Sequence, residues 1–348
     1  MKIHEKYLNR CIELAKNGLG KTYPNPMVGS VIVHNNIIIG EGWHQKAGEP
    51  HAEVNAVNSV KDTSLLKEAT IYVSLEPCSH YGKTPPCCDL IIAKEIKNVV
   101  IGTVDPFVEV AGRGIKKLME KGHHVTIGVL DEACKELNKR FFTFHTQKRP
   151  FIILKWAQTA DGFIDTIRKE ESEIQPNWIT NSFSRQLVHK MRSEEQAILV
   201  GTNTVLNDNP KLNTRDWKGN NPVRVILDRS LRIPESYSVY DQSVKTIFIT
   251  EKSRDNAHNL IFETIDFSNT IANQICDILY KHQLQSVIIE GGKQTLQTFI
   301  DANLWDEAYI FEGNIVFNSG IEAPILNNKK IVAKQTITTN TLTIYKKQ

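Results

Sequence analysis

Along the first half of the chain, short segments in which apolar residues recur with the period of a strand alternate with segments in which they recur with the period of a helix. Two apolar runs flank the pair Asn35-Asn36, a sequence that predicts a β-hairpin. Strand patterns lie at residues 27–33, 37–42, 69–75, 99–102 and 124–127, and helical patterns at residues 51–60, 87–94 and 114–121. Strands that alternate with helices pack in layers, so this half is predicted to be an α/β domain.

The second half begins with an apolar strand at residues 151–156, after a charged stretch made up of residues 138–140 and 146–150. Further strand patterns lie at residues 197–200, 223–227, 246–249 and 286–289, helical patterns at 181–192, 270–281 and 294–302, and a β-rich tail at 336–345. This half is again predicted to be α/β. The charged stretch predicts a boundary near residue 147, so we expect one domain at 1–147 and another at 148–348. A chain of 348 residues has room for two domains of ordinary size.

Composition excludes several classes of protein. The chain is 41% hydrophobic and 23% charged, with a formal net charge of +3, which is too small an excess to predict binding to nucleic acid or to a membrane surface. No apolar run has the length of a membrane span. The N-terminus reads as an amphipathic helix and not as a signal peptide, and six cysteines without a secretion signal predict reduced thiols in the cytoplasm.

Candidate metal ligands lie between residues 51 and 87. The chain reads His51-Ala-Glu53, then Leu-Glu-Pro-Cys78, then Pro-Pro-Cys87-Cys88. One imidazole and two thiolates would leave a tetrahedral Zn²⁺ one open position, which is typical of a catalytic site. We assign Cys87 as the ligand because the two prolines before it favour a helix start there, and we expect Cys88 to pack in the core. The remaining cysteines (Cys11, Cys134 and Cys276) are isolated and are expected to be packing residues.

This ligand set predicts a hydrolytic deaminase. Zinc would make hydroxide available near neutral pH for attack on a ring carbon that bears an amino group. Glu53, two residues after the imidazole, could carry protons to the ring and to the departing amine; alone it could equally be a solvated acid in the first turn of a helix. His-x-Glu followed by Pro-Cys and a second Cys is typical of zinc-dependent nucleobase deaminases. Their usual spacing is Pro-Cys-x-x-Cys, whereas here eight residues separate Cys78 from Cys87.

The second half carries weaker chemical signals. Residues 287–292 read as a strand that ends in Gly291-Gly292, and a helical pattern follows. Such a turn could bring a phosphate to the helix N-terminus, or it could be a plain tight turn. Arg192 and Arg215 could bind a phosphate through their planar guanidinium groups, or they could be solvated surface residues.

Taken together, these motifs resemble the bifunctional deaminase/reductase family of riboflavin biosynthesis. The resemblance rests on Asn25-Pro, Gly42-Trp-His44, His51-Ala-Glu53, the run from Leu75 to Asp89, Asp105-Pro and Val110-Ala-Gly-Arg-Gly114. The eight-residue separation of the two cysteines is the family's own spacing. The resemblance implies that His51, Cys78 and Cys87 bind zinc and that Glu53 moves protons. It also implies that Asn25, His44, Lys83 and Asp105 line the pocket for a pyrimidine ribosyl phosphate.

The second half resembles the family's dihydrofolate-reductase-like domain, through residues 155–162, 178–180, 201–210 and 290–292. The resemblance implies that NADPH contacts Ala157, Trp178, Thr204, Asp208 and Gly292. It implies substrate contacts at Arg192, Leu212, Arg215 and Glu290. Two segments depart from the family's pattern. Residues 166–177 are longer and more charged than usual, with Pro176 where a substrate-binding serine is expected, and residues 314–324 lack the usual glycines.

The expected fold is therefore a cytidine-deaminase-like zinc domain followed by a dihydrofolate-reductase-like α/β domain. The implied function is zinc-dependent deamination of 2,5-diamino-6-(ribosylamino)-4(3H)-pyrimidinone 5'-phosphate, then NADPH-dependent reduction of the ribosyl group to ribityl, by a homo-oligomer. Three alternatives stay open. The departures above allow an active deaminase with a degenerate reductase half. A nucleic-acid base deaminase would favour the shorter cysteine spacing and a basic, aromatic surface. A zinc-stabilised binding protein would favour four protein ligands and would not need Glu53.

Overall fold

The computed structural model describes residues 2–81, 85–107, 111–168 and 174–348. It contains two compact units, Met1–Lys148 and Arg149–Gln348, and each is described here by itself. Among these residues no helix combines the length and the apolar character that a membrane crossing requires.

The first unit is built on a five-stranded sheet with the order β2-β1-β3-β4-β5. Its strands are β1 (Gly29–His34), β2 (Ile37–Trp43), β3 (Thr70–Leu75), β4 (Asn98–Thr103) and β5 (His124–Ile127). β1 pairs antiparallel with β2 and β3, and the last three strands are parallel. The predicted hairpin joins β1 to β2, and Asn35 and Asn36 both have positive φ (48° and 65°), as tight hairpin turns require.

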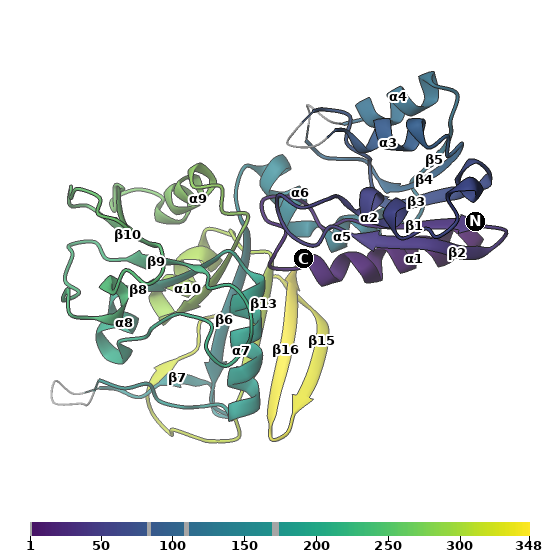
Figure 1. Cartoon of the computed structure of the whole chain (residues 1–348). Coiled ribbons are helices and arrows are strands. Elements are labelled where there is room, and N and C mark those ends of the chain that lie inside the picture. Colours follow the sequence, from purple (N-terminus) through teal and green to yellow (C-terminus); the bar gives the residue numbers. More distant parts are fainter. Residues whose placement is uncertain (1, 82–84, 108–110, 169–173) are drawn as a thin grey trace. The chain divides into compact units, whose positions relative to one another are not determined.

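Helices cover both faces of this sheet (Figure 1). They are α1 (Lys2–Ala15), α2 (Ala52–Asn58), α3 (Cys87–Ala93), α4 (Arg113–Glu120), α5 (Asp131–Leu137) and α6 (Lys139–Gln147). Neighbouring residues of a strand point to opposite faces, so Val31 packs with Tyr7 and Leu8 of α1, whereas Ile32 packs in the core that contains α2, α3 and α4. The charged stretch used to predict the domain boundary is mostly helix α6, because Phe141 and Phe144 give it a buried face.

The second unit contains a nine-stranded sheet with the order β11-β10-β9-β8-β12-β6-β13-β16-β15. The strands are β6 (Phe151–Gln158), β8 (Ala197–Gly201), β9 (Val223–Leu227), β10 (Thr246–Thr250), β11 (Leu260–Thr264), β12 (Ser286–Gly291), β13 (Glu307–Glu312), β15 (Lys329–Ile337) and β16 (Asn340–Lys347). The seven strands from β11 to β13 are parallel, and the hairpin β15–β16 continues the sheet antiparallel beside β13. A separate pair joins β7 (Phe163–Asp165) to β14 (Ile321–Glu322).

Four helices pack on this sheet: α7 (Ser182–Glu194), α8 (Thr202–Asp208), α9 (Ile271–Lys281) and α10 (Lys293–Asp301). The buried residues of α9 and α10 pack in one core, and those of α7 and α8 belong to two others. α8 begins directly after β8 ends at Gly201, and α10 begins two residues after β12 ends at Gly291. In parallel α/β sheets ligands bind outside the carboxyl ends of the strands, so these junctions are where a site is expected.

Candidate functional sites

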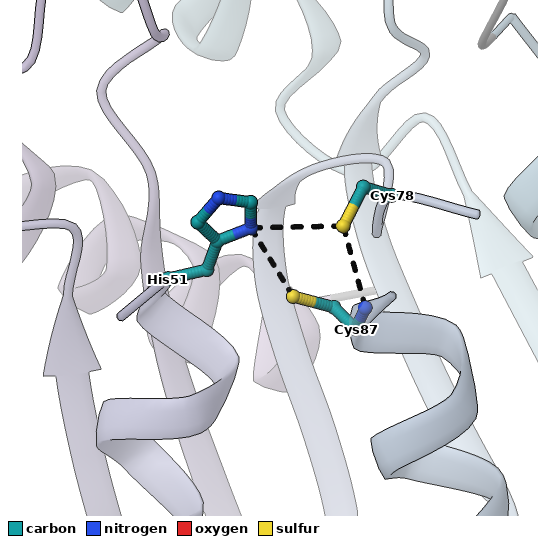
Figure 2. Close-up of side chains that lie close together, drawn as sticks. All are labelled: His51, Cys78 and Cys87. Atoms are coloured by element: carbon teal, nitrogen blue, oxygen red, sulfur yellow. Dashed lines mark hydrogen bonds between the residues drawn. The ribbon is translucent and has the colours of Figure 1, made fainter. Parts of the chain in front are cut away.

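Three potential metal ligands meet in the first unit, as the sequence predicted (Figure 2). His51 caps the N-terminus of α2, Cys87 is the first residue of α3, and Cys78 follows β3. The Nδ1 atom of His51 lies 3.6 Å from Cys78 Sγ and 3.3 Å from Cys87 Sγ. The three ligand atoms lie within 4.8 Å of one another, and among the residues that the structure describes this is the one such group found.

The donor set fits zinc. Zn–S bonds of about 2.3 Å and Zn–N bonds of about 2.0 Å in a tetrahedron hold the ligand atoms roughly 3.5 Å apart, close to the separations seen here. Hydrogen bonds from Cys87, including its backbone N–H at 3.3 Å, lower the pKa of the Cys78 thiol to about 4. The pKa of Cys87 is raised because its thiol is hydrogen-bonded to Cys78. These contacts favour the thiolate form of Cys78, which is the form that binds a metal.

Glu53 lies in the first turn of α2, where its side chain is buried with only 3% of the residue exposed. Burial and the nearby Cys78 raise its pKa to about 7. A solvated acid would be exposed, so the buried position disagrees with that alternative. A carboxyl group whose pKa lies near neutrality can both accept and give a proton, which suits general acid–base chemistry.

Two of the predicted pocket residues, Asn25 and His44, are hydrogen-bonded to each other beside the ligand cluster. The Asn25 amide nitrogen lies 3.1 Å from His44 Nε2, and His44 Nδ1 lies 3.1 Å from the Pro50 carbonyl. Because that carbonyl can only accept, Nδ1 carries the proton and Nε2 accepts from Asn25. The His44 ring meets His51 edge to face at 5.3 Å. Lys83, another predicted pocket residue, lies outside the described part of the chain.

Asp105, the fourth predicted pocket residue, begins the loop after β4 and is partly buried. Burial raises its pKa to about 6. Its backbone N–H donates to Glu76, which also accepts the backbone N–H groups of Gly112, Gly114 and Ile115. Glu76 therefore fixes the loop that carries Asp105 and the start of α4. No sequence pattern indicates this role, because the partners are backbone groups 29 to 39 residues away.

The other cysteines pack as predicted. Cys88 is fully buried, and its thiol donates to the Pro77 carbonyl at 3.2 Å. Cys11, Cys134 and Cys276 are also buried and unpaired by disulfides.

A single cavity of about 1020 Å³ in the second unit contains the predicted reductase residues. All five predicted NADPH contacts and all four predicted substrate contacts line it. Ligand pockets measure roughly 300–1,000 Å³, so this cavity lies at the upper end of that range. Nine lysine and arginine side chains line it, against three acids (Asp165, Asp208 and Glu290). The small net charge of the whole chain conceals this local excess, which suits phosphorylated ligands.

The buried centre of the cavity is an ion-pair cluster. Arg192 donates to both carboxylate oxygens of Glu290, from Nε at 3.0 Å and from Nη2 at 2.8 Å, and Lys155 Nζ lies 3.6 Å from Glu290. Burial alone would raise the pKa of Glu290, but the charges of Arg192 and Lys155 lower it to about 2. Burial lowers the pKa of Lys155. Lys155 was not predicted as part of the site, because one lysine in an apolar strand forms no recognisable pattern.

The junction of β12 and α10 fits a cofactor phosphate. Gly292 is the N-cap of α10 and has no side-chain cap, so backbone N–H groups of the first turn are available at the cavity. Gly291 has a φ of +139°, a conformation that side chains disfavour, and a Cβ at Gly292 would lie 3.4 Å from Thr204 Oγ1. The backbone can therefore approach a ligand closely here. A nicotinamide dinucleotide fits this arrangement.

The atypical segment before α7 contributes residues that no motif predicted. Arg168 donates to Asp165 at 3.0 Å and to Asp208 at 2.9 Å, so it links the end of β7 to α8 at the cavity. Pro176 and Asn177 line the same cavity. The departure from the family's pattern thus changes the wall of the cavity without removing it.

A zinc-deaminase unit followed by an α/β unit with a large cationic cavity defines a two-domain deaminase and reductase. Two known domain families match accordingly: the cytidine and deoxycytidylate deaminase zinc-binding region at residues 1–103, and the RibD C-terminal domain at residues 150–320. The chain belongs to the family of the riboflavin biosynthesis protein RibD and is a bifunctional enzyme with a zinc-binding deaminase domain and a reductase domain of the NADPH-using type. The predicted fold class is confirmed.

Similar proteins cover nearly the whole chain. The RibD protein of Aquifex aeolicus is 39% identical over 334 residues, which are 94% of this chain and 92% of that protein. The RibD protein of Actinobacillus pleuropneumoniae is 49% identical over 88% of this chain and 82% of its own length. A crystal structure of the diaminohydroxyphosphoribosylaminopyrimidine deaminase/5-amino-6-(5-phosphoribosylamino)uracil reductase of Thermotoga maritima is 38% identical and covers 100% of this chain and 99% of its own, with a TM-score of 0.89.

Proposed function

We propose that this enzyme acts on the two compounds for which the Thermotoga maritima relative is named. Residues 1–147 would deaminate the diaminohydroxyphosphoribosylaminopyrimidine, and residues 148–348 would reduce the 5-amino-6-(5-phosphoribosylamino)uracil that results. The observation that carries the proposal is the gathering of the predicted residues at two sites, the cluster at His51 and the cavity at Glu290. Each site lies within one compact unit.

In the deaminase, His51, Cys78 and Cys87 would hold zinc. When bound, zinc supplies a Lewis acid that activates water for attack on the ring carbon bearing the amino group. Glu53 would accept a proton from that water and deliver one to the adjacent ring nitrogen. It would then take the second proton from the newly bonded hydroxyl and pass it to the amino group, which leaves as ammonia while the carbonyl forms. Its burial and raised pKa support both directions of transfer.

Asn25, His44, Lys83 and Asp105 would bind the pyrimidine. The hydrogen bond between Asn25 and His44 supports a fixed orientation for both side chains. The bond from His44 to Pro50 supports the tautomer in which Nδ1 carries the proton. Asp105, whose loop is held by Glu76, would accept hydrogen bonds from the substrate.

In the reductase, Ala157, Trp178, Thr204, Asp208 and Gly292 would contact NADPH. When bound, NADPH supplies the hydride that reduces the ribosyl carbon. The free N–H groups after Gly292 would bind its pyrophosphate. Arg192, Leu212, Arg215 and Glu290 would bind the substrate, with the arginines toward its phosphate. The excess of cations in the cavity supports two phosphorylated ligands and speaks against a degenerate reductase half.

The remaining parts of the proposal concern assembly and location. A homo-oligomer is proposed because the family resemblance implies one, and a cytoplasmic location is proposed from the cysteine content. Relatives along most of the chain are riboflavin-biosynthesis proteins, which favours this function over a nucleic-acid base deaminase or a zinc-stabilised binding protein.

Substrate identity can be tested with the 5'-phosphate and its dephosphorylated form. With the phosphorylated diaminopyrimidine and NADPH, we expect first the deaminated and then the ribityl product by mass spectrometry. Loss of the phosphate should lower kcat/KM for reduction by on the order of 100-fold, because hydrogen bonds to a charged group contribute about 1.5–3 kcal/mol each. Equal turnover of the two forms would contradict the proposed phosphate contacts. Absence of the deaminated product would refute the substrate assignment.

The domain assignment can be tested with the two halves made separately. Residues 1–147 should deaminate without NADPH, and residues 148–348 should reduce the deaminated compound, because each unit buries its own core. A second half that is well folded by circular dichroism but cannot reduce this compound would contradict the assignment.

A further inference from the structure

The loop that carries Arg215 is attached to one face of α7. Arg192 Nη1 donates to the Asn213 carbonyl at 3.3 Å, and the Arg215 backbone N–H donates to His189 Nδ1 at 3.2 Å. Gly219 packs so closely on Ser193 that a Cβ there would collide with it. The loop is therefore held at three points, and one of them is the backbone of a predicted phosphate ligand.

The contact at His189 defines the state of this imidazole. Because Nδ1 accepts an N–H, it carries no proton, and the proton is on Nε2, which lies 3.4 Å from Asp216 Oδ2. The side chain is 4% exposed. Burial, and then the charges of Arg192 and Arg215, lower its pKa to about 4, although Asp216 and Glu290 act in the opposite direction. At neutral pH His189 is thus a neutral acceptor.

Arg215 is an exposed residue at the wall of the cavity, and within the described part of the chain no acid or hydrogen-bond acceptor binds its guanidinium. Arg192, by comparison, is fixed at its guanidinium by Glu290. The direction of the Arg215 side chain therefore depends on its backbone, and of the three attachments the one at His189 holds the Arg215 backbone itself.

We propose that His189 is a positioning residue of the reductase: its neutral ring holds the Arg215 backbone against α7 and so aims the guanidinium at the substrate phosphate. The proposal rests on the proposed function of Arg215 as a phosphate ligand. His189 itself need not touch the substrate. The role requires an acceptor at Nδ1 and not simply a side chain of similar volume.

Two substitutions separate these requirements. His189→Asn keeps an acceptor, because Asn Oδ1 occupies nearly the place of His Nδ1, but it loses volume. His189→Leu keeps much of the volume and removes the acceptor, so the Arg215 N–H loses its partner on α7. In the full-length enzyme, His189→Leu should raise KM for the deaminated substrate by on the order of tenfold with little change in kcat, whereas His189→Asn should stay near wild type. If Asn raises KM as much as Leu, the side chain acts by packing and the proposal is wrong.

Combining His189→Leu with Arg215→Ala tests whether one residue acts through the other. We expect Arg215→Ala to raise KM and His189→Leu to add nothing further in that background. If the leucine variant multiplies KM by the same factor in both backgrounds, Arg215 remains a substrate ligand but the positioning role is refuted. If Arg215→Ala leaves KM unchanged, the proposed function of Arg215 is itself wrong.

NADPH affinity, measured by fluorescence titration, should be the same in the two His189 variants and in the wild type. A loss of NADPH affinity in His189→Leu would contradict a role confined to the loop that carries Arg215.

Discussion

Arg192 and Glu290 face each other in the reductase cavity through two parallel hydrogen bonds, Nε to Oε1 at 3.0 Å and Nη2 to Oε2 at 2.8 Å. Their side chains are 12% and 9% exposed. Both were predicted as substrate contacts, yet each is also the other's partner. The pair is thus part of the fold of the cavity as well as of its proposed chemistry.

Breaking this pair should destabilise the second unit. Arg192→Met leaves a buried carboxylate with only Lys155 beside it, and loss of one partner of a buried pair costs about 3–5 kcal/mol. Adding Glu290→Leu should recover part of that stability, because Lys155 can then lose its proton and no buried charge remains unpaired. The reductase activity should not be recovered. Urea unfolding followed by tryptophan fluorescence can measure this, because four of the five tryptophans lie after residue 148. Equal stability of the single and double variants would show that the two residues are not coupled.

The low pKa of Glu290 predicts how stability depends on pH. Its pKa is 4.5 in a model compound and about 2 in the folded protein, so between these values the unfolded chain binds a proton that the folded chain does not. Stability from this group is therefore complete above pH 4.5 and is lost as pH falls toward 2, by about 3 kcal/mol in total. The free energy of unfolding of wild type should fall more steeply over this range than that of Glu290→Gln. Parallel curves would contradict the assigned shift.

The adjacent cysteines offer a matched test of the zinc site. Cys87→Ser should lose zinc because its sulfur is one of the three clustered ligand atoms. Cys88→Ser should keep close to one zinc per chain, since the Cys88 thiol points to the Pro77 carbonyl, which a hydroxyl can also reach. Metal analysis of the purified proteins decides the assignment, and the opposite pattern would reverse it.

Glu53→Gln separates metal binding from catalysis. The amide has a similar shape but cannot exchange a proton, so zinc content should stay near wild type while deamination falls at least ~10²-fold. Reduction of the supplied deaminated compound serves as the internal control and should be unaffected. Near-normal deamination by a zinc-loaded variant would remove Glu53 from the mechanism.

The zinc cluster could be predicted from the sequence because its information is local. His51 and Cys87 each lie at a helix start, and the motif fixes the residue types. The function of Glu76 could not be predicted, because it depends on a loop that returns from residues 105–115. The period of apolar residues located the strands of the first unit and the central strands of the second, but it missed β11, β13, α5 and α8. It also missed α6, whose charged residues hide the buried Phe141 and Phe144.

The reductase site as a whole was predicted only through the family resemblance, although the residue patterns alone offered Gly291-Gly292, Arg192 and Arg215 as candidate phosphate contacts. Its residues come from β6, α7, α8 and β12 and meet at the cavity, so no single segment contains a motif. Lys155 and His189 were missed for the same reason: each owes its role to a partner distant in sequence, Glu290 and Arg215 respectively. Sequence spacing carries no information about such pairs.

The central claim is that one chain performs two reactions, of which only the first depends on zinc. The most direct measurement compares the zinc-loaded enzyme with enzyme depleted of metal by a chelator, each given the diaminopyrimidine substrate or the deaminated compound together with NADPH. We expect depletion of zinc to abolish deamination and added zinc to restore it. The rate of NADPH oxidation with the deaminated compound should be the same before and after depletion. Loss of both reactions on depletion in an enzyme that remains folded, or deamination that survives complete removal of zinc, would contradict it.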